Sequence, residues 1–382
     1  MTPTPDSYWV ALRRIKGLGP RTAKLLLERF ELPERIFAAG EAALAEAGIS
    51  RTVARSIAEF RGFEELEKEL CEVARLDARL IRWSDSEYPP NLRQIADPPP
   101  FLFARGTAMA EERQCVAVVG ARIASDAGRS MARRLGFELA ARGFTVVSGL
   151  ARGIDAEAHQ GALDSGGRTI AVMGCGIDII YPPENHKLAD EIVKGGGLIV
   201  SELPIGTPPL AENFPTRNRI LSGLALGAVI VEASERSGSL ITARMALEQD
   251  RQVFAVPGSP ISGKAHGSNR LIKQGAVLVE CVEDVIEELA PQLVKKDAAQ
   301  FLGRWSTART PAATPSSVVS ALQALSKDAQ AILSCLKDDE KLHVDSIIEA
   351  SGLSPQTVLG FLLEMELKGM VQQHPGKLFS LA

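Results

Sequence analysis

Four segments of the sequence place small or polar residues where an apolar stretch gives way to a helical pattern, and three of them contain arginine. They run from Val118 to Arg122, from Ser148 to Asp155, from Phe214 to Arg219 and from Ser237 to Thr242. A helix that starts after such a turn presents free backbone N–H groups and the positive end of its dipole, and both bind phosphate. One segment would fit a nucleotide, whereas four along one sheet edge predict a run of phosphates.

The first and third segments combine phosphate-binding cations with an aromatic ring. Arg122 stands where the dinucleotide fingerprint Gly-x-Gly-x-x-Gly needs a small residue, so that motif is absent, and its guanidinium suits a phosphate instead. Ser125 is placed to cap the next helix. The alternative to a phosphate site is that Ser125 has only this capping role and that Arg122 only pairs with a surface carboxylate. Phe214 beside Arg217 and Arg219 suits single-stranded nucleic acid, whose bases stack on aromatic rings at about 1–3 kcal/mol each. The alternative is that Phe214 belongs to the core and one arginine holds the loop.

The second segment is the more specific one. Gly149 and Gly153 bracket Arg152, which allows a close backbone approach beside a cation. Asp155 is placed to cap the following helix, and His159 lies one helical turn on, on the same face. An Asp–His pair can act as a general base. Because no Ser, Cys or metal cluster stands at suitable spacing, we interpret this pair as structural.

The middle of the chain, about residues 73–295, alternates β-branched runs with patterns of helical length. Seven of these runs are apolar on both faces, as in the central strands of a parallel sheet: Val116–Val119, Thr145–Val147, Thr169–Val172, Leu198–Val200, Ala228–Val231, Val253–Val256 and Ala276–Val279. The helices between them include residues 125–142 and 239–249. The pattern predicts an α/β fold with a doubly wound sheet, preceded by an extended lead-in around Tyr88. Such sheets bind ligands at the carboxyl ends of their strands.

The first 72 residues read as short helices. Arg14–Ala23 looks like a helix-hairpin-helix turn, in which two glycines allow a tight reversal, and Ala45–Ala54 is a weaker copy. The pair predicts a small domain of four or five helices. Its first turn, with Lys16 and Arg21 beside it, either contacts DNA or has an architectural or partner role.

The C-terminal part divides into a linker, residues 296–320, and a folded tail, residues 321–382. The linker is rich in Ala, Ser, Thr and Pro. The tail predicts helices over Lys327–Leu336, Val344–Ala350 and Ser354–Lys368 and a hairpin at Pro375–Gly376, which together indicate a winged helix. The tail has five lysines and eight acidic residues, and its third helix has no arginine that could bind the edge of a guanine base. A protein-contact or regulatory module is therefore favoured over a duplex reader.

Composition narrows the class of protein. The chain has 382 residues, a net charge of −4 and five scattered cysteines. The length favours two or three domains. The charge restricts any DNA-binding surface to a local basic patch. No apolar run approaches the roughly 20 residues of a membrane span, and the N-terminus lacks the pattern of an export signal. We expect a cytoplasmic protein with no membrane partner, whose cysteines are small apolar residues in a reducing compartment.

The order of these segments, with Tyr181–Asn185 between the second and third, closely resembles the DNA-processing protein A (DprA/Smf) family along essentially the whole chain. The resemblance implies a non-catalytic protein that binds single-stranded DNA and helps load the recombinase RecA onto it, in natural transformation or DNA processing. It also implies an extended Rossmann-like core that forms a homodimer, an N-terminal sterile-alpha-motif-like domain and an optional winged-helix domain. We expect no cofactor and no metal.

Carried over onto the matching positions, the resemblance implies a DNA-binding set of glycines, hydroxyl residues, arginines and one aromatic residue. The set is Gly120, Arg122, Ser125, Ser148, Gly149, Leu150, Arg152, Gly153, Phe214, Arg217, Asn218, Arg219, Ser237, Gly238 and Ser239. One departure is the approach to Phe214, residues 210–213, which has no cation and contains Glu212. Affinity per protomer would then be modest, and dimerisation would matter more. Alanine at position 122 or 217 is expected to weaken DNA binding without unfolding the protein.

Two other functions compete with this interpretation. Nucleotide phosphoribohydrolases with similar α/β folds resemble one another through Pro-Gly-Gly-x-Gly-Thr-x-x-Glu. The corresponding helix start here, Ser237–Met245, has no glutamate at the required spacing. Regulation through duplex binding by the tail is disfavoured by the acidic balance of that tail. The sequence therefore favours a single-strand binder over an enzyme or a duplex reader.

Overall fold

The computed structural model describes residues 3–107 and 114–293, and in the tail it describes residues 332, 335–336, 342–355, 357–358, 361–362, 371–374 and 378–381. The chain forms two compact units, one within residues 1–303 and one within residues 304–382. The predicted linker lies outside the described residues. The predicted boundary near residue 72 falls inside a helix, α6 (Phe63–Arg75), and the division into domains stays a prediction.

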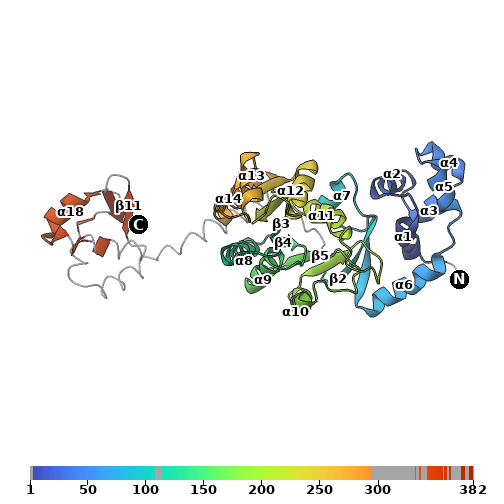
Figure 1. Ribbon diagram of the computed structural model, residues 1–382, viewed down its shortest axis with the longest axis horizontal. Coiled ribbons are helices and arrows are strands. Elements are labelled where there is room, and N and C mark those ends of the chain that lie inside the picture. Colours follow the sequence, from blue (N-terminus) through green and yellow to red (C-terminus); the bar gives the residue numbers. More distant parts are fainter. Residues whose placement is uncertain are drawn as a thin grey trace. The chain divides into compact units, whose positions relative to one another are not determined.

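A nine-stranded sheet occupies the centre of the first unit, in the order β1-β2-β6-β5-β4-β3-β7-β8-β9 (Figure 1). The strands are β1 (Ala78–Arg82), β2 (Phe101–Gly106), β3 (Cys115–Gly120), β4 (Thr145–Ser148), β5 (Thr169–Val172), β6 (Leu198–Ser201), β7 (Gly227–Val231), β8 (Gln252–Ala255) and β9 (Val277–Leu278). Neighbours from β6 to β9 are parallel, whereas β2 pairs antiparallel with both β1 and β6. The mostly parallel α/β sheet confirms the predicted fold class.

All seven predicted strands are present, with ends that differ by no more than one residue. The strands β1 and β2 were not predicted, because the sequence before residue 115 was interpreted only as an extended lead-in. Both belong to the antiparallel edge, where β1 carries Arg79 and Arg82 and β2 ends in Arg105 and a glycine. This mixture of apolar and charged residues hides the pattern of a buried strand.

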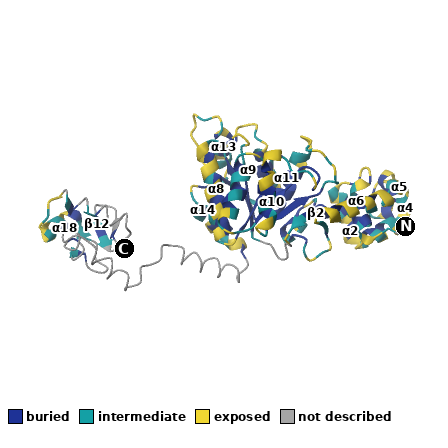
Figure 2. Cartoon of the chain, turned by 90° about the horizontal axis from the view of Figure 1, so that it is seen from below, coloured by how far each residue is buried: buried dark blue, intermediate teal, exposed yellow. Residues whose placement is uncertain are grey.

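Helices cover both faces of the sheet. They are α7 (Pro90–Gln94), α8 (Asp126–Ala141), α9 (Ile154–Asp164), α10 (His186–Lys194), α11 (Asn213–Leu224), α12 (Ser239–Glu248), α13 (His266–Lys273) and α14 (Val282–Leu289), with short 3₁₀ turns at Pro183–Asn185 and Ala290–Gln292. Side chains of β3 alternate between the faces: Val116 and Val118 join a core with α8, α9 and α14, and Ala117 and Val119 join one with α7, α11 and α12. The central strands β3 to β7 are buried almost throughout, as their dark blue colour in Figure 2 indicates. None of the described helices is long and apolar enough to cross a membrane.

The N-terminal region is helical, as predicted. Its helices are α1 (Pro5–Arg14), α2 (Pro20–Phe30), α3 (Pro33–Ala38), α4 (Glu41–Glu46), α5 (Arg51–Ala58) and α6. The predicted turn and its weaker copy fall between α1 and α2 and between α4 and α5. Gly17 and Gly48 occupy equivalent places in the two turns, each with a φ of +83°, which favours glycine. The shared backbone geometry agrees with the internal repeat that the sequence indicated.

This helical region packs against the antiparallel edge of the sheet. Its apolar residues form one continuous cluster with Phe101, Phe103 and Ile199 of the sheet. The Nζ of Lys24 donates to the carbonyl oxygen of Ile95 at 3.1 Å, and the backbone N–H of Ile205 donates to Glu69 at 3.1 Å. The first unit is therefore one body held by a shared core and polar contacts.

The second unit contains the elements of a winged helix. Its described parts include α18 (Val344–Ser351) and a three-stranded antiparallel sheet, in the order β10 (Leu342–His343), β12 (Leu378–Leu381), β11 (Val371–His374). These confirm the second predicted helix and the strands on either side of the predicted hairpin. The turn at Pro375–Gly376 lies outside the described residues, as do most of the first predicted helix and part of the third. A small core includes Val344, Ile347 and Phe379.

Candidate nucleic-acid interface

A pocket of about 420 Å³ lies where the strand order reverses. The chain runs outward from β3 through β4 and β5 to β6, then crosses back to β7, which pairs with β3. Open α/β sheets bind ligands at such a reversal, beyond the carboxyl ends of the strands. The lining residues come from all four predicted segments: Val119, Gly120, Arg122, Ala151, Asp155, Ala211, Phe214, Pro215, Arg217, Asn218, Leu221, Ser237, Gly238, Ser239, Ile241 and Thr242. The fold thus brings the four segments together.

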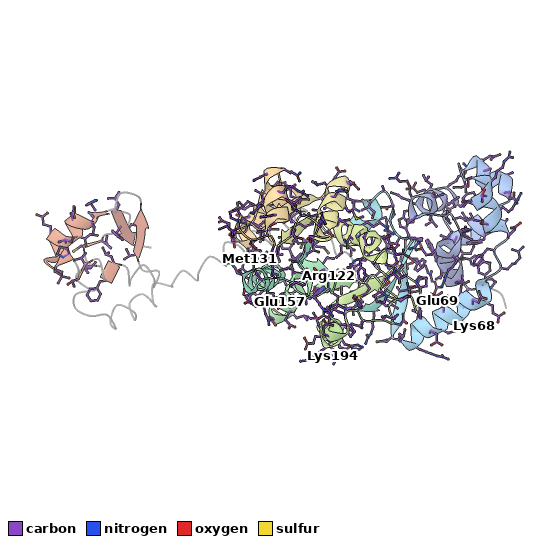
Figure 3. All side chains as sticks on the ribbon, viewed as in Figure 1. Lys68, Glu69, Arg122, Met131, Glu157 and Lys194 are labelled. Atoms are coloured by element: carbon purple, nitrogen blue, oxygen red, sulfur yellow. The ribbon has the colours of Figure 1, made fainter. Side chains whose placement is uncertain are left out.

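Arg122 and Phe214 stack at the edge of this pocket. The guanidinium carbon of Arg122 lies 5.1 Å from the ring centroid of Phe214, within the range of a cation–π contact. Arg122 is exposed and is labelled in Figure 3, near the middle of the sheet domain, and no carboxylate of the described residues pairs with it. Phe214 is partly buried, and Tyr181 lies beside it with ring centroids 5.8 Å apart. The alternative in which Arg122 only meets a surface carboxylate is therefore not what the structure contains.

Arg152 is the second exposed arginine of the predicted set. It borders a small hollow that also includes Arg122, Tyr181 and Phe214. Its guanidinium forms an ion pair with Glu184, and the two side chains are 57% and 49% exposed. The hydrogen bond from Arg152 lowers the pKa of Glu184. A phosphate that binds Arg152 must therefore compete with a carboxylate that is already there.

Arg217 lies beneath this surface. It is 5% exposed, and its Nη1 donates to the carbonyl oxygens of Gly149, at 3.0 Å, and of Val172. Burial lowers the pKa of Arg217 to about 10, and the charge of Asp155 opposes that shift. A Cβ at Gly149 would lie 2.6 Å from the guanidinium, so glycine makes room for it. We expect Arg217→Ala to destabilise the fold, which corrects the expectation from sequence that it would act on binding alone.

Asp155 joins two of the predicted segments. Its carboxylate accepts the backbone N–H of Gly149 at 3.1 Å, and it also accepts backbone hydrogen bonds from Ala151 and Gly120. Burial raises the pKa of Asp155, while Arg217 and these N–H groups oppose the rise. The sequence predicted a helix cap here. The structure instead gives Asp155 the role of fixing the loops after β3 and β4.

Arg219 does not line the pocket. It is 5% exposed, and its Nη2 donates to Oε2 of Glu202, itself 4% exposed, at 2.5 Å. A second carboxylate, Asp97, lies 3.7 Å from its Nε, and Arg13 of the helical region approaches Glu202 at 3.9 Å. Because its charge is neutralised inside the protein, we leave Arg219 out of the proposed DNA contacts.

Four further members of the predicted set have framework roles. Ser148 is fully buried, and its hydroxyl donates to the carbonyl oxygen of Val118 at 2.7 Å. Leu150 is fully buried and adopts a left-handed φ of +54°. Gly153, with φ +71°, leaves no room for a Cβ, which would lie 2.4 Å from the carbonyl oxygen of Ala121. Ser125 caps α8, as its place in the sequence indicated, by accepting the N–H of Gly128 at 3.0 Å.

The remaining predicted residues line the pocket. Gly120, Asn218, Ser237, Gly238 and Ser239 all do so, and the hydroxyls of Ser237 and Ser239 lie 2.7 Å apart at the start of α12. Hydroxyl and amide groups at a helix start suit a phosphate or the polar edge of a base. The geometry therefore divides the predicted set into a surface group and a supporting group.

Sequence reasoning passed over two residues of this region. Tyr181 was noted only as part of a motif, although its ring extends the aromatic surface of Phe214. Glu232 was not considered, although its carboxylate accepts the backbone N–H of Ser125 at 2.8 Å. A sequence signal existed for Glu232, because it is an acid placed directly after the all-apolar strand β7.

His159 is fully buried and does not form the predicted pair with Asp155. Its Nδ1 lies 2.6 Å from Oγ1 of Thr169, whose hydroxyl donates to the carbonyl oxygen of Val146 at 2.7 Å. Nδ1 must therefore carry the hydrogen, which leaves Nε2 buried without a partner. Burial lowers the pKa of His159 from 6.5 to about 3.

We predict that His159 makes the protein sensitive to acid. Because the folded-state pKa is depressed, the stabilisation is present above pH 6.5 and is lost as the pH falls toward 3. Over that range this one group should lower the free energy of unfolding by about 1.4 kcal/mol per pH unit. His159→Asn keeps a donor for Thr169 and removes the titration. Urea unfolding of both proteins at pH 7, 6 and 5 should give a shallower decline for the variant; equal declines would contradict the prediction.

Comparison with protein-family models gives three matches. The model described as DNA recombination-mediator protein A matches residues 79–290, which contain the sheet and the pocket. The DprA winged helix domain matches residues 311–377. A SAM-like helix-hairpin-helix tandem matches residues 10–61. The three matches thus fall in the N-terminal, middle and C-terminal parts of the chain.

Individual proteins and solved structures of the same family are also similar to this chain. The chain is 35% identical to Protein Smf of Synechocystis over 98% of both chains. The X-ray structure of DNA processing protein A from Streptococcus pneumoniae has a TM-score of 0.64 and 35% identity, and the match covers 75% of this chain and 99% of that one. A structure of DNA processing protein A from Helicobacter pylori, a study of its single-stranded DNA binding mode, has a TM-score of 0.51 and 29% identity, over 57% of this chain and 97% of that one.

Proposed function

Because this chain belongs to the DNA recombination-mediator protein A (DprA/Smf) family, we propose that it is a non-catalytic protein that binds single-stranded DNA. The proposed surface consists of Arg122, Arg152 and Phe214 at the edge and of Gly120, Asn218, Ser237, Gly238 and Ser239 in the pocket. Arg217 and Asp155 support it from below.

The observation that carries this proposal is the stack of Arg122 on Phe214 at the edge of the pocket. A base that is not paired in a duplex can stack on an aromatic ring, while an adjacent cation follows the backbone phosphates. Arg122 is exposed and has no carboxylate partner among the described residues, so its charge is available to a phosphate. Bases in a duplex already stack on one another, and for this reason we propose a preference for single strands.

We extend the proposal to the role that the family resemblance implies. The protein would help load RecA onto single-stranded DNA, during DNA uptake and natural transformation or during DNA processing, and would act as a homodimer through the sheet domain. The net charge of −4 supports the dimer indirectly, since one small basic surface on an acidic body gives few phosphate contacts.

A binding experiment with the full-length protein tests this function. Fluorescence anisotropy with labelled oligonucleotides of one length should show tighter binding to a single strand than to the duplex, with little dependence on sequence. The logarithm of the binding constant should fall with the logarithm of salt concentration, with a slope of about 0.7 per phosphate neutralised. Equal affinity for both forms would contradict the proposal. Release of a base from AMP by the protein would instead favour a nucleotide-processing enzyme.

A further inference from the structure

We propose that Glu232 is a positioning residue for single-stranded DNA binding, because it holds the loop that carries Arg122. This inference rests on the proposed function of the surface around Arg122. It assigns to an acidic residue a favourable effect on the binding of a polyanion.

The carboxylate of Glu232 is bound at the start of α8. Its Oε2 accepts the backbone N–H of Ser125 at 2.8 Å, and its Oε1 accepts the hydroxyl of the same serine. That hydroxyl oxygen in turn accepts the N–H of Gly128. A Cβ at Gly128 would lie 2.6 Å from the carboxyl carbon of Glu232, so the glycine lets the carboxylate approach the first turn. An anion at this position also interacts favourably with the helix dipole.

The backbone of Glu232 supports a specific role for the residue. Its φ is +53°, in the left-handed region that glycine adopts far more readily than an acid with a Cβ. Residues kept in such a conformation cluster at functional sites, where the surrounding structure holds them. Glycine would adopt this backbone conformation with less strain. The presence of a glutamate therefore points to a role for its side chain.

The loop from Gly120 to Ser125 is fixed at both ends. At its start, a Cβ on Gly120 would lie 1.8 Å from the carbonyl oxygen of Val231, so β3 and β7 enclose it closely. The next carbonyl, of Ala121, accepts the N–H of Ile154 at 3.3 Å. At the far end the contacts to Glu232 hold Ser125. Arg122 lies between these two points, and its place over Phe214 depends on both.

Charge alone and positioning predict opposite effects for the loss of this acid. If Glu232 acted only through its charge, its removal would lessen repulsion of phosphate and tighten DNA binding. If it acts by holding the loop, its removal releases Arg122 from its place over Phe214, and binding weakens. The sign of the change therefore separates the two explanations.

The test uses full-length protein and the variants Glu232→Gly and Glu232→Gln. Glycine removes the carboxylate and eases the left-handed backbone, so folding should be retained, as checked by circular dichroism melting. The amide of glutamine can still accept the Ser125 N–H and contact its hydroxyl. By anisotropy, Glu232→Gly should bind a single-stranded oligonucleotide roughly five- to tenfold more weakly than the parent, a loss about the size of one ordinary hydrogen bond, because Arg122 is displaced and not removed. Glu232→Gln should bind within about twofold of the parent.

Combining Glu232→Gly with Arg122→Ala tests whether Glu232 affects DNA binding through Arg122. When residues act through one another, their effects are not additive. We expect Glu232→Gly to cause no further loss of affinity in the Arg122→Ala background, whereas a general structural defect would weaken binding in both backgrounds. Parent-like or tighter binding by Glu232→Gly, or an added loss in the double variant, would overturn this inference alone. Failure of the parent to bind single strands would overturn the proposed function, and with it this inference.

Discussion

Replacing Arg122 with alanine should lower the affinity for single-stranded DNA by roughly tenfold or more, because it removes a charge-assisted phosphate contact and the cation beside Phe214. The melting temperature should change by no more than about 2 °C, since Arg122 is exposed and no ion pair with a described residue is lost. Anisotropy titrations at one fixed salt concentration, together with thermal melting, measure both quantities.

A matched control comes from α8, the helix that follows the loop of Arg122. Arg134 of α8 is 53% exposed and pairs with Glu138 of its own helix. Arg134→Ala removes the same charge from the protein without touching the pocket, so its affinity should stay within about twofold of the parent. Arg122→Lys should fall between parent and alanine, because lysine keeps the charge but loses the planar group that stacks on the ring. Equal losses for Arg122→Ala and Arg134→Ala would mean that only net charge matters and that the proposed surface is wrong.

Replacing Arg219 with alanine should have the largest effect on stability. The substitution leaves the carboxylate of Glu202, which is 4% exposed, without its closest partner. Removing one member of a buried ion pair typically costs about 3–5 kcal/mol. Chemical denaturation should therefore show a large loss of unfolding free energy. DNA affinity of the remaining folded protein should stay close to that of the parent, because the side chain does not reach the proposed surface.

Two further variants make the stability prediction specific. Replacing both Arg219 and Glu202 with leucine should recover much of the loss, since no charge is then left buried and unpaired. Arg29→Ala removes an arginine from an ion pair with Glu46 whose side chains are 49% and 75% exposed, so it should change stability by less than about 1 kcal/mol. If Arg219→Ala weakened DNA binding while leaving the unfolding free energy unchanged, the buried role assigned to Arg219 would be contradicted.

The architecture was largely predictable because it depends on patterns that are local in the sequence. Apolar runs such as Val116–Val119 are typical of central strands, and the paired glycine turns at residues 17 and 48 indicated the helical repeat. The antiparallel edge escaped prediction because β1 and β2 mix charges with apolar residues. A strand that pairs with partners far along the chain, as β2 does with β6, leaves no local sign of that pairing.

The sequence predicted which segments form the candidate site. It predicted less well which of their side chains are exposed and which are bound inside the protein. All four segments meet at one pocket, because parallel strands end at the same edge of the sheet. The arginines, however, have different roles. Arg122 and Arg152 are exposed, whereas Arg217 and Arg219 belong to the part of α11 that faces the interior. Arginine content alone does not indicate which part of a helix will be buried.

The sequence by itself determined the family, the doubly wound sheet and the edge at which the four loops gather, because strand period, glycine turns and motif order are local features of the sequence. Only the tertiary structure decided which charged groups remain available there. Folding pairs Glu202 with Arg219, binds Glu232 at the start of α8 and leaves Arg122 exposed to solvent. The physical reason is that the free charge of a side chain depends on burial and on partners distant in sequence, which only folding brings together.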